Sequence, residues 1–455
     1  MVGRRSSSLW RDTATAQVTA SLAAFTRTTL VCSLGKVQRV LGTLVEGVVP
    51  NVCIGEQCEL FHPDRPQQIR RAEVVGFNET TTLLSPLSTL DGLSAGYLIR
   101  PLRSAHRVAI GPALLGRLLD GFGQPLDGLP ALDAAAPDLR LRAVIADAPS
   151  PGDRPRIDTV FPTGVRSVDT MLTIGKGQRV GIFAAPGCGK TTLMAAIGRG
   201  SQIDALVLGL IGERGREVRE FTEHELDPEL LSRTVIVCAT SDRPPIERVR
   251  AAFTATAIAE GLRDSGLNVL LMIDSLTRLA RAQREIGLAA GEAPARAGFP
   301  PSVYAMLPRL IERAGKTNKG AITAIYTVLL DGDIKSDPIS EEAVSLLDGH
   351  ILLSRKLAEQ GHYPAIDVLP SISRVMAGII PHEHLRASAR LRQILARYRE
   401  VELLIRLGEY REGLDPEMDQ VVKTHPKVID FLQQDTRIGA NWHDSVERML
   451  QLAGG

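Results

Sequence analysis

The stretch Gln178-Arg-Val-Gly-Ile-Phe-Ala-Ala-Pro-Gly-Cys-Gly-Lys-Thr-Thr-Leu-Met194 decides the fold of this chain. It opens with an apolar run over Val180–Ala185 that is typical of a buried parallel strand. It closes with helix-forming residues at Thr192–Ile197, and Pro186-Gly-Cys-Gly-Lys-Thr191 forms a turn of small residues between them. A strand, a glycine-rich turn and a helix in this order predict a phosphate-binding loop.

The residues of this loop suit a nucleotide. Glycines let backbone N–H groups approach phosphate oxygens, and the following helix points its positive end at the same anion. We expect Lys190 to reach the β- and γ-phosphates and Thr191 to bind Mg²⁺ through its hydroxyl. The strict motif has glycine where this chain has Ala184, so an accidental glycine-rich turn is the alternative. The predicted nucleotide contacts are Pro186, Gly187, Cys188, Gly189, Lys190, Thr191 and Thr192.

Composition indicates a globular protein of several domains. The chain has 455 residues, which is more than one hydrophobic core usually serves, so two or three domains are expected. Lysine and arginine almost balance aspartate and glutamate, giving a net charge of +1, so no global basic field points to nucleic acid. No apolar run approaches the length that spans a bilayer. The scattered cysteines fit reduced thiols of a cytosolic protein.

The first 100 residues divide into an arm and a β-rich region. Residues 1–26 are rich in arginine and serine, which favours a flexible or partner-docking arm over an organelle transit peptide. Residues 27–100 contain short apolar runs separated by turn residues, and they predict a small β-barrel. Few aromatic residues occur there, which disfavours binding of single-stranded nucleic acid.

Residues 101–375 are expected to form an α/β domain that contains the phosphate loop. Residues 101–162 are rich in proline, glycine and aspartate and are interpreted as an irregular wrap. Beyond them, near-continuous apolar runs alternate with helical segments, which predicts a parallel sheet covered on both faces. Ligands of such sheets bind beyond the carboxyl ends of the strands.

Two acidic residues follow apolar runs at these carboxyl ends. Asp274 directly follows Val269–Ile273, which is the Walker B arrangement for holding Mg²⁺. Glu213 follows Leu210-Ile-Gly212 and is the candidate that polarises the attacking water. The alternative for Glu213 is an ion pair with Arg214 or Arg216.

Residues 376–455 are predicted to form a helical domain. Apolar side chains recur at helical spacing, at Leu391, Ile394, Leu395 and Tyr398. His382-Glu-His384 lacks the spacing of a metal site, so no metal is expected there.

Several longer motifs carry a family resemblance. The chain resembles the rotary and secretion ATPase superfamily, and within it the type III secretion and flagellar export ATPases. The motifs are Thr163-Gly-Val-Arg-Ser-Val-Asp169, Gly175-Lys-Gly-Gln-Arg-Val180, Ile211-Gly-Glu-Arg-Gly-Arg-Glu-Val218, Ala239-Thr-Ser-Asp-Arg-Pro244, Gly298-Phe-Pro-Pro-Ser-Val303, Leu346-Leu-Asp-Gly-His350, His362-Tyr-Pro-Ala-Ile-Asp367 and Ser371-Ile-Ser-Arg374. Val428-Ile-Asp-Phe-Leu-Gln-Gln-Asp435 resembles the non-flagellar branch.

The resemblance implies a RecA-like P-loop core and roles for single residues. Glu213 matches the catalytic glutamate, Arg214 a phosphate-contacting arginine, and Asp274 the Walker B aspartate. Arg374 matches an arginine finger that a neighbouring subunit inserts into the site, and Tyr363 resembles the aromatic residue beside adenine. A core tyrosine at a turn is the alternative for Tyr363.

The resemblance also implies a function and partners. It implies a homohexameric Mg²⁺-dependent ATPase that powers protein export by releasing chaperones and unfolding substrates, in the cytoplasm at the inner membrane. The implied partners are a stator-like protein at the N-terminal region, a stalk-like protein in the pore, chaperone–substrate complexes at the C-terminal helices and a membrane export gate. The segment 285–302 is expected to line the pore. The alternatives are a catalytic subunit of a rotary ATP synthase or proton pump, and a hexameric motor that tracks RNA.

Overall fold

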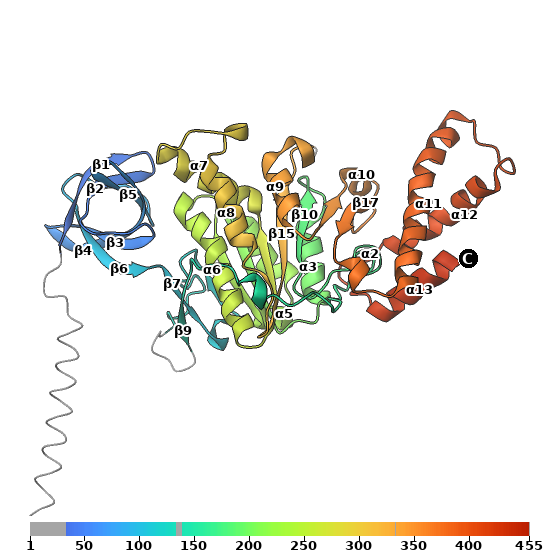
Figure 1. Ribbon diagram of the computed structural model, residues 1–455, viewed down its shortest axis with the longest axis horizontal. Helices are drawn as coiled ribbons and strands as arrows, with labels where there is room; N and C mark the ends of the chain where they lie inside the picture. The colour runs from blue at the N-terminus through green and yellow to red at the C-terminus, as the bar shows by residue number, and fades with distance from the viewer. Residues whose placement is uncertain (1–32, 133–138, 333, 455) are drawn as a thin grey trace, which may run out of the picture.

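The computed structural model describes residues 33–132, 139–332 and 334–454, so the predicted arm at residues 1–26 lies outside them. The described chain forms three parts in sequence order, with a barrel at one end, an α/β core in the middle and helices at the other end (Figure 1). None of the described helices has both the length and the apolar character needed to cross a bilayer.

The first part is a closed six-stranded barrel with strand order β1-β2-β5-β4-β3-β6. Alternate residues such as Val45, Leu60 and Leu84 point inward and are fully buried, which is the period-two pattern of a barrel strand. The last strand runs to Ala105, past the expected boundary at residue 100. The strands are β1 (Gly35–Leu41), β2 (Leu44–Val48), β3 (Glu56–His62), β4 (Arg65–Asn78), β5 (Thr81–Pro86) and β6 (Leu98–Ala105).

The segment expected to be an irregular wrap contains three short strands. β7 (Arg107–Ile110) pairs with β9 (Arg140–Ala143), whereas β8 (Leu118–Leu119) joins the edge of the central sheet beside β12. Part of this segment therefore belongs to the sheet of the α/β core.

The central sheet has the order β17-β16-β10-β15-β13-β11-β12-β8, and β14 pairs with β15. The pairs are parallel except β16–β17 and β14–β15. The predicted parallel sheet is therefore confirmed, with an antiparallel strand at one edge. Its longer strands are β10 (Arg179–Ala184), β11 (Ala205–Ile211), β12 (Thr234–Ala239), β13 (Asn268–Asp274), β15 (Ala321–Leu329), β16 (Gly349–Leu353) and β17 (Ile366–Ser373); β14 is Gly315–Lys316.

Helices cover both faces of this sheet, because alternate strand residues point to opposite sides. Phe183 and Val207 pack with the helices α6 to α9, whereas Ile182 and Leu208 pack with α2, α3 and α5. The α-helices of this part of the chain are α2 (Arg166–Met171), α3 (Lys190–Gly200), α4 (Gly215–Glu220), α5 (Pro228–Ser232), α6 (Pro245–Asp264), α7 (Leu276–Ala289), α8 (Pro301–Ile311), α9 (Pro338–Leu346) and α10 (Arg355–Glu359).

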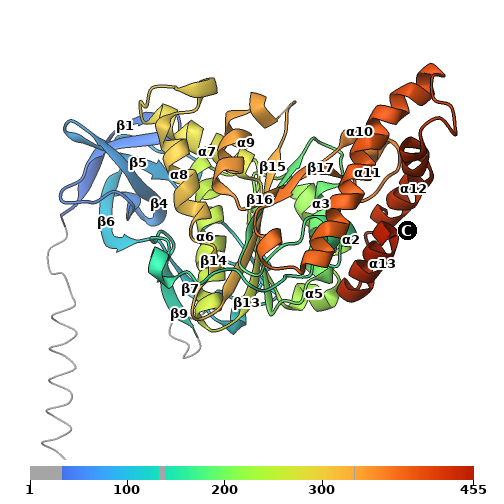
Figure 2. The ribbon, with the colours of Figure 1, turned by 45° about the vertical axis from the view of Figure 1, so that its right-hand side comes forward.

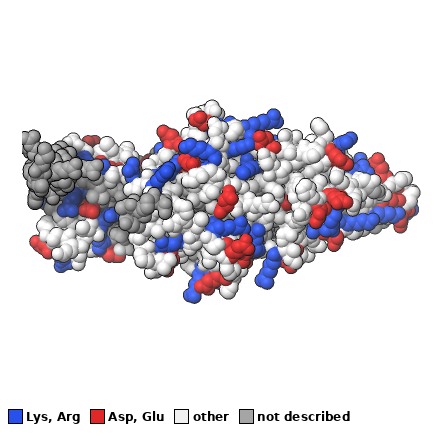
Figure 3. All heavy atoms as spheres, turned by 90° about the horizontal axis from the view of Figure 1, so that it is seen from below, with Lys and Arg blue, Asp and Glu red and all other residues white. Residues whose placement is uncertain are grey.

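The third part consists of α11 (His382–Leu407), α12 (Pro416–Leu432) and α13 (Trp442–Gly454). The predicted stripe is buried at Leu391, Ile394 and Leu395, and these residues share an apolar cluster with Val168 and Met171 of α2. Figure 2 shows these three helices on the side of the core that is remote from the barrel. On the face in Figure 3, acidic and basic side chains are intermingled over the core and the helices.

Candidate active site

The phosphate loop connects β10 to α3. Gly187 and Gly189 have φ angles of 81° and 80°, a left-handed conformation that glycine adopts without a steric cost. They turn the chain so that α3 begins at Lys190, with the free N–H groups of its first turn facing the loop. The loop therefore has the geometry of an anion site.

Lys190 lies between the two predicted acidic residues. Its Nζ is 2.5 Å from Oδ1 of Asp274 and 3.8 Å from Oε1 of Glu213. Asp274 ends β13 and Glu213 follows β11, and these strands are neighbours in the sheet. Parallel strands bring the residues at their carboxyl ends together, so the sheet itself assembles this group.

The environment of Glu213 alters its acidity. Burial, aided by the negative charge of Asp274 and opposed by Lys190 and Arg278, raises the pKa of Glu213 to about 7. A carboxylate with a pKa near neutrality is well matched to accept a proton from water.

Two residues of this group escaped the sequence analysis. Arg278 on α7 places Nη2 3.0 Å from Oε2 of Glu213 and donates through Nη1 to the carbonyl of Gly212 at 2.7 Å. Thr327 on β15 donates its hydroxyl to Oδ1 of Asp274 at 2.6 Å. Thr327 is a polar residue near the carboxyl end of an apolar run, so the rule that selected Asp274 could also have found it.

A cavity of about 590 Å³ joins these residues to the phosphate loop. Arg214 also lines it, but its side chain is largely exposed and its nearest acid is Glu217, at 3.7 Å. The Cys188 side chain is buried beneath the loop, so only its backbone can face a phosphate. The cavity is lined from the loop by Pro186, Gly187, Gly189, Lys190, Thr191 and Thr192.

The donor set of the cavity fits Mg²⁺. Thr191 and Asp274 both line it, and a hydroxyl and a carboxylate are the hard oxygen ligands that Mg²⁺ prefers. Lys190 contributes a positive charge where the phosphates of a nucleotide would need one.

Tyr363 lies beside the phosphate loop of its own chain. A β carbon placed on Gly189 would be 3.6 Å from Cε1 of Tyr363. The ring is thus in reach of a nucleotide bound at this loop.

Arg374 lies at the other end of β17. The backbone N–H of Arg374 donates to the carbonyl of Asp348, and the N–H of Asp348 donates to the carbonyl of Arg179. Arg179 is the first residue of β10, so Arg374 lies near the start of that strand. The phosphate loop follows Ala184, the last residue of β10, which lies five residues beyond Arg179 along that strand, or roughly 17 Å at about 3.3 Å per residue. The Arg374 guanidinium is exposed and donates to the carbonyl of Val344 at 3.1 Å. Arg374 is therefore remote from the phosphate loop of its own chain.

Comparison with known proteins agrees with this geometry. Residues 164–373 match the ATP synthase alpha/beta family, nucleotide-binding domain, and residues 380–451 match the T3SS EscN ATPase C-terminal domain. The Type 3 secretion system ATPase of Pseudomonas savastanoi pv. phaseolicola is 54% identical over 92% of this chain and 93% of its own. The Flagellum-specific ATP synthase of Bacillus subtilis is 45% identical over 92% of this chain and 95% of its own.

A solved structure has the same fold. The assembled ATPase EscN in complex with its central stalk EscO, from the enteropathogenic E. coli type III secretion system, has a TM-score of 0.83 and 45% identity. The match covers 92% of this chain and 100% of that chain. The higher identity to the secretion ATPase and the EscN-type C-terminal match agree with the predicted non-flagellar branch. The chain belongs to the type III secretion system ATPase family and is an ATP hydrolase related to the ATP synthase alpha/beta proteins.

Proposed function

We propose that this protein acts as a homohexameric ring in which each ATP site is completed by Arg374 of the neighbouring subunit. The observation that carries the proposal is the course of β17, which has Tyr363 at the phosphate-loop end and Arg374 at the opposite end. One strand can thus serve two sites, its own through Tyr363 and the neighbour's through Arg374. The barrel at the opposite end from the helices serves in oligomerisation.

Each residue of the site has a separate task. The loop N–H groups and Lys190 bind the phosphates, and Tyr363 packs against the adenine. Thr191 and Asp274 hold Mg²⁺, which when bound neutralises phosphate charge. Glu213 orients and deprotonates the attacking water, with Arg278 fixing the carboxylate. Arg214 and the neighbour's arginine finger stabilise charge on the transferred phosphoryl group.

Hydrolysis in the ring powers type III protein export. The family membership and the assembled EscN ring with its central stalk EscO support a stalk-like partner in the pore here as well. A stator-like protein binds the N-terminal region, chaperone–substrate complexes bind the C-terminal helices, and the ring releases chaperones and unfolds substrates. It works in the cytoplasm, against an export gate at the inner membrane. No nucleic acid takes part.

Mixed rings test the proposal. Lys190→Ala removes phosphate binding but keeps the finger, whereas Arg374→Ala removes the finger but keeps the phosphate loop. Rings of either variant alone should be inactive, and co-assembled rings should recover part of the activity because some interfaces are complete. Arg374→Lys should rescue poorly, since an ammonium cannot reproduce the planar guanidinium. Mixed rings of verified composition that recover nothing would show that Arg374 does not act in trans.

A further inference from the structure

Strand β17 bulges out of its ladder between Asp367 and Ile372, shortly before Arg374. Leu352 of β16 pairs with Asp367, and His350 pairs with Ile372, so β17 advances five residues where β16 advances two. The residues between them bulge out of the sheet, and their carbonyls lose ladder partners. Bulges redirect the chain that follows, and buried carbonyls need a donor. Whatever satisfies this bulge therefore sets the course of the strand into Arg374.

Three of the four carbonyls in the bulge accept bonds from the helical domain, and the fourth, that of Pro370, lies 2.9 Å from Nε2 of His350 on β16. Arg392 of α11 donates through Nη1 to the carbonyls of Val368, at 2.5 Å, and Leu369, at 3.4 Å. Its Nη2 donates to the carbonyl of Ser371 at 3.2 Å and to that of Met171, the last residue of α2, at 3.0 Å. A guanidinium can make such a set of bonds because it is planar and presents several N–H groups in fixed directions.

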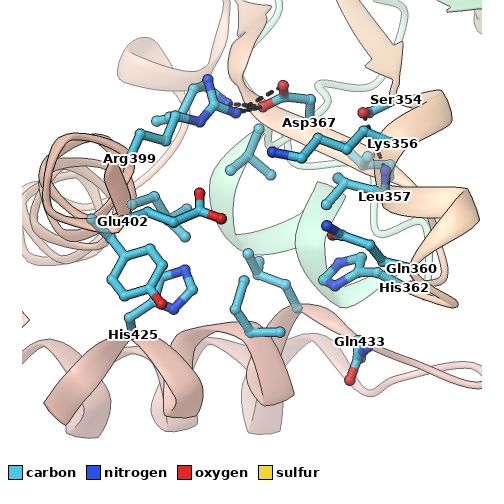
Figure 4. Close-up of a pocket in the computed structure, with 17 residues that line it drawn as sticks. Ser354, Lys356, Leu357, Gln360, His362, Asp367, Arg399, Glu402, His425 and Gln433 are labelled. Atoms are coloured by element: carbon cyan, nitrogen blue, oxygen red, sulfur yellow. Dashed lines mark hydrogen bonds and ion pairs between the residues drawn. The ribbon is translucent and has the colours of Figure 1, made fainter. Parts of the chain in front are cut away.

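A second arginine of α11 binds the residue just before the bulge. Arg399 places Nη2 2.8 and 2.9 Å from the two carboxylate oxygens of Asp367. Arg392 and Arg399 are separated by about two helical turns and so lie on one face of α11. Figure 4 shows the Arg399–Asp367 pair in the wall of a cavity of about 730 Å³ between the α/β core and the helices α11 and α12. Around this cavity, bridges from arginines of α11 add to the apolar cluster through which the helices pack on the core.

We propose that Arg392 is a positioning residue for the active site of the neighbouring subunit. It fixes the bulge of β17 and thereby the place from which Arg374 enters that site. The inference rests on the proposed role of Arg374 in trans and extends it to the helical domain. A partner that displaces α11 would change hydrolysis in the next subunit of the ring, and the cavity leaves α11 room to move.

The variant Arg392→Met keeps the linear stem and removes all four donated bonds. Rings of Arg392→Met should bind ATP with an affinity within about twofold of wild type, because the phosphate loop is untouched, while kcat falls by roughly 10²-fold, the scale of a small misplacement. Arg386→Met is the matched control. Arg386 is exposed on the same helix and makes no side-chain hydrogen bond or ion pair within the described residues, so its variant should hydrolyse ATP normally.

Complementation separates positioning from general damage. Arg392→Met subunits mixed with Lys190→Ala subunits should recover activity, as Arg374→Ala subunits do, because the finger then comes from an intact β17. Mixed with Arg374→Ala subunits they should recover none. One outcome would overturn only the role of Arg392 and leave that of Arg374 intact. In it, Arg374→Ala subunits recover activity with Lys190→Ala subunits, but Arg392→Met subunits do not. Failure of both mixtures would overturn the trans role of Arg374.

If Arg392→Met does not enter rings, Arg399→Met carries the same test. Arg399 is largely exposed and its loss leaves the four bonds of Arg392 in place, so assembly should survive. The same complementation pattern with a smaller loss of kcat is expected. Wild-type kcat for Arg399→Met would count against control of the finger by α11.

Discussion

At the level of single residues, Lys190 separates two carboxylates that would otherwise repel each other. Asp274 and Glu213 are both buried, and a buried charge without a partner is costly. The lysine offsets part of their charge, mainly through its closer contact to Asp274, and Arg278 pairs with Glu213 at 3.0 Å. When phosphates bind, the Lys190 ammonium also contacts the phosphates. Arg278 is then the main cationic partner of Glu213.

Replacing Glu213 by glutamine should separate binding from chemistry. The amide keeps the shape of the side chain but cannot take a proton from water, so ATP affinity should change little while kcat falls by roughly 10²–10⁴. Lys190→Ala should instead weaken both, because it removes a charge from the phosphates. Nucleotide titration of assembled rings gives the ATP affinity, and their steady-state turnover gives kcat. Turnover near wild type in Glu213→Gln would exclude Glu213 as the base.

The sequence sufficed for residues whose role lies in a local pattern. The glycine turn before Lys190 and the apolar run before Asp274 each predict their function without knowledge of the sheet. Arg278 was not found because its contact with Glu213 depends on β11 and β13 being neighbours, which no local pattern reveals. Thr327 likewise acts across two strands.

At the level of elements, the start of α6 contains a titratable contact. Glu247 is buried against the backbone of Gly121, with Arg243 3.8 Å away and with Asp120 and Asp242 nearby. Burial, aided by both aspartates and opposed by Arg243, raises the pKa of Glu247 from 4.5 to about 7. The folded state therefore holds the proton more tightly than the unfolded state, and stability falls as the pH rises from about 4.5 through 7.

Glu247→Gln should remove this pH dependence. The neutral amide has no charge to bury, so the Tm of the variant relative to wild type should increase between pH 5 and pH 8. Thermal scans at one fixed rate give the comparison. The control is Glu229→Gln, a change at an exposed residue of α5. Its Tm difference from wild type should be the same at pH 5 and pH 8. A Glu247→Gln difference that is independent of pH would contradict the raised pKa.

The connection between α7 and α8 belongs to the predicted pore segment 285–302. The structure places the end of α7 and the start of α8 within this segment, with an exposed loop between them that includes Ala293. With Cys32 and Cys53 replaced by serine, Ala293→Cys should crosslink to a neighbouring subunit or to a stalk partner. Ser232→Cys, exposed on α5, is the control and should not. Crosslinks from Ala293→Cys only to proteins of the outer surface would contradict the placement.

Element boundaries were harder to predict than element types. The barrel, the parallel sheet and the helical domain followed from apolar periodicity, whereas β8 is only two residues long and has no pattern to detect. The bulge of β17 was also beyond prediction, because the bonds from Arg392 that satisfy it come from a different part of the chain.

At the scale of the whole molecule, the barrel and the helical domain lie at opposite ends of the α/β core (Figure 1). Two parts of one chain can therefore contact different partners while the core between them carries out hydrolysis. In the proposed ring, β17 connects the helical domain to two sites, because Tyr363 precedes it and Arg374 follows it.

The structure of an assembled ring with a non-hydrolysable ATP analogue tests this central claim most directly. The account predicts that the Arg374 guanidinium lies within hydrogen-bond distance, about 3 Å, of the γ-phosphate bound by Lys190 of the neighbouring subunit. Tyr363 beside that nucleotide should come from the same subunit as Lys190. A ring in which Arg374 contacts the nucleotide of its own subunit, or no nucleotide at all, would contradict the account.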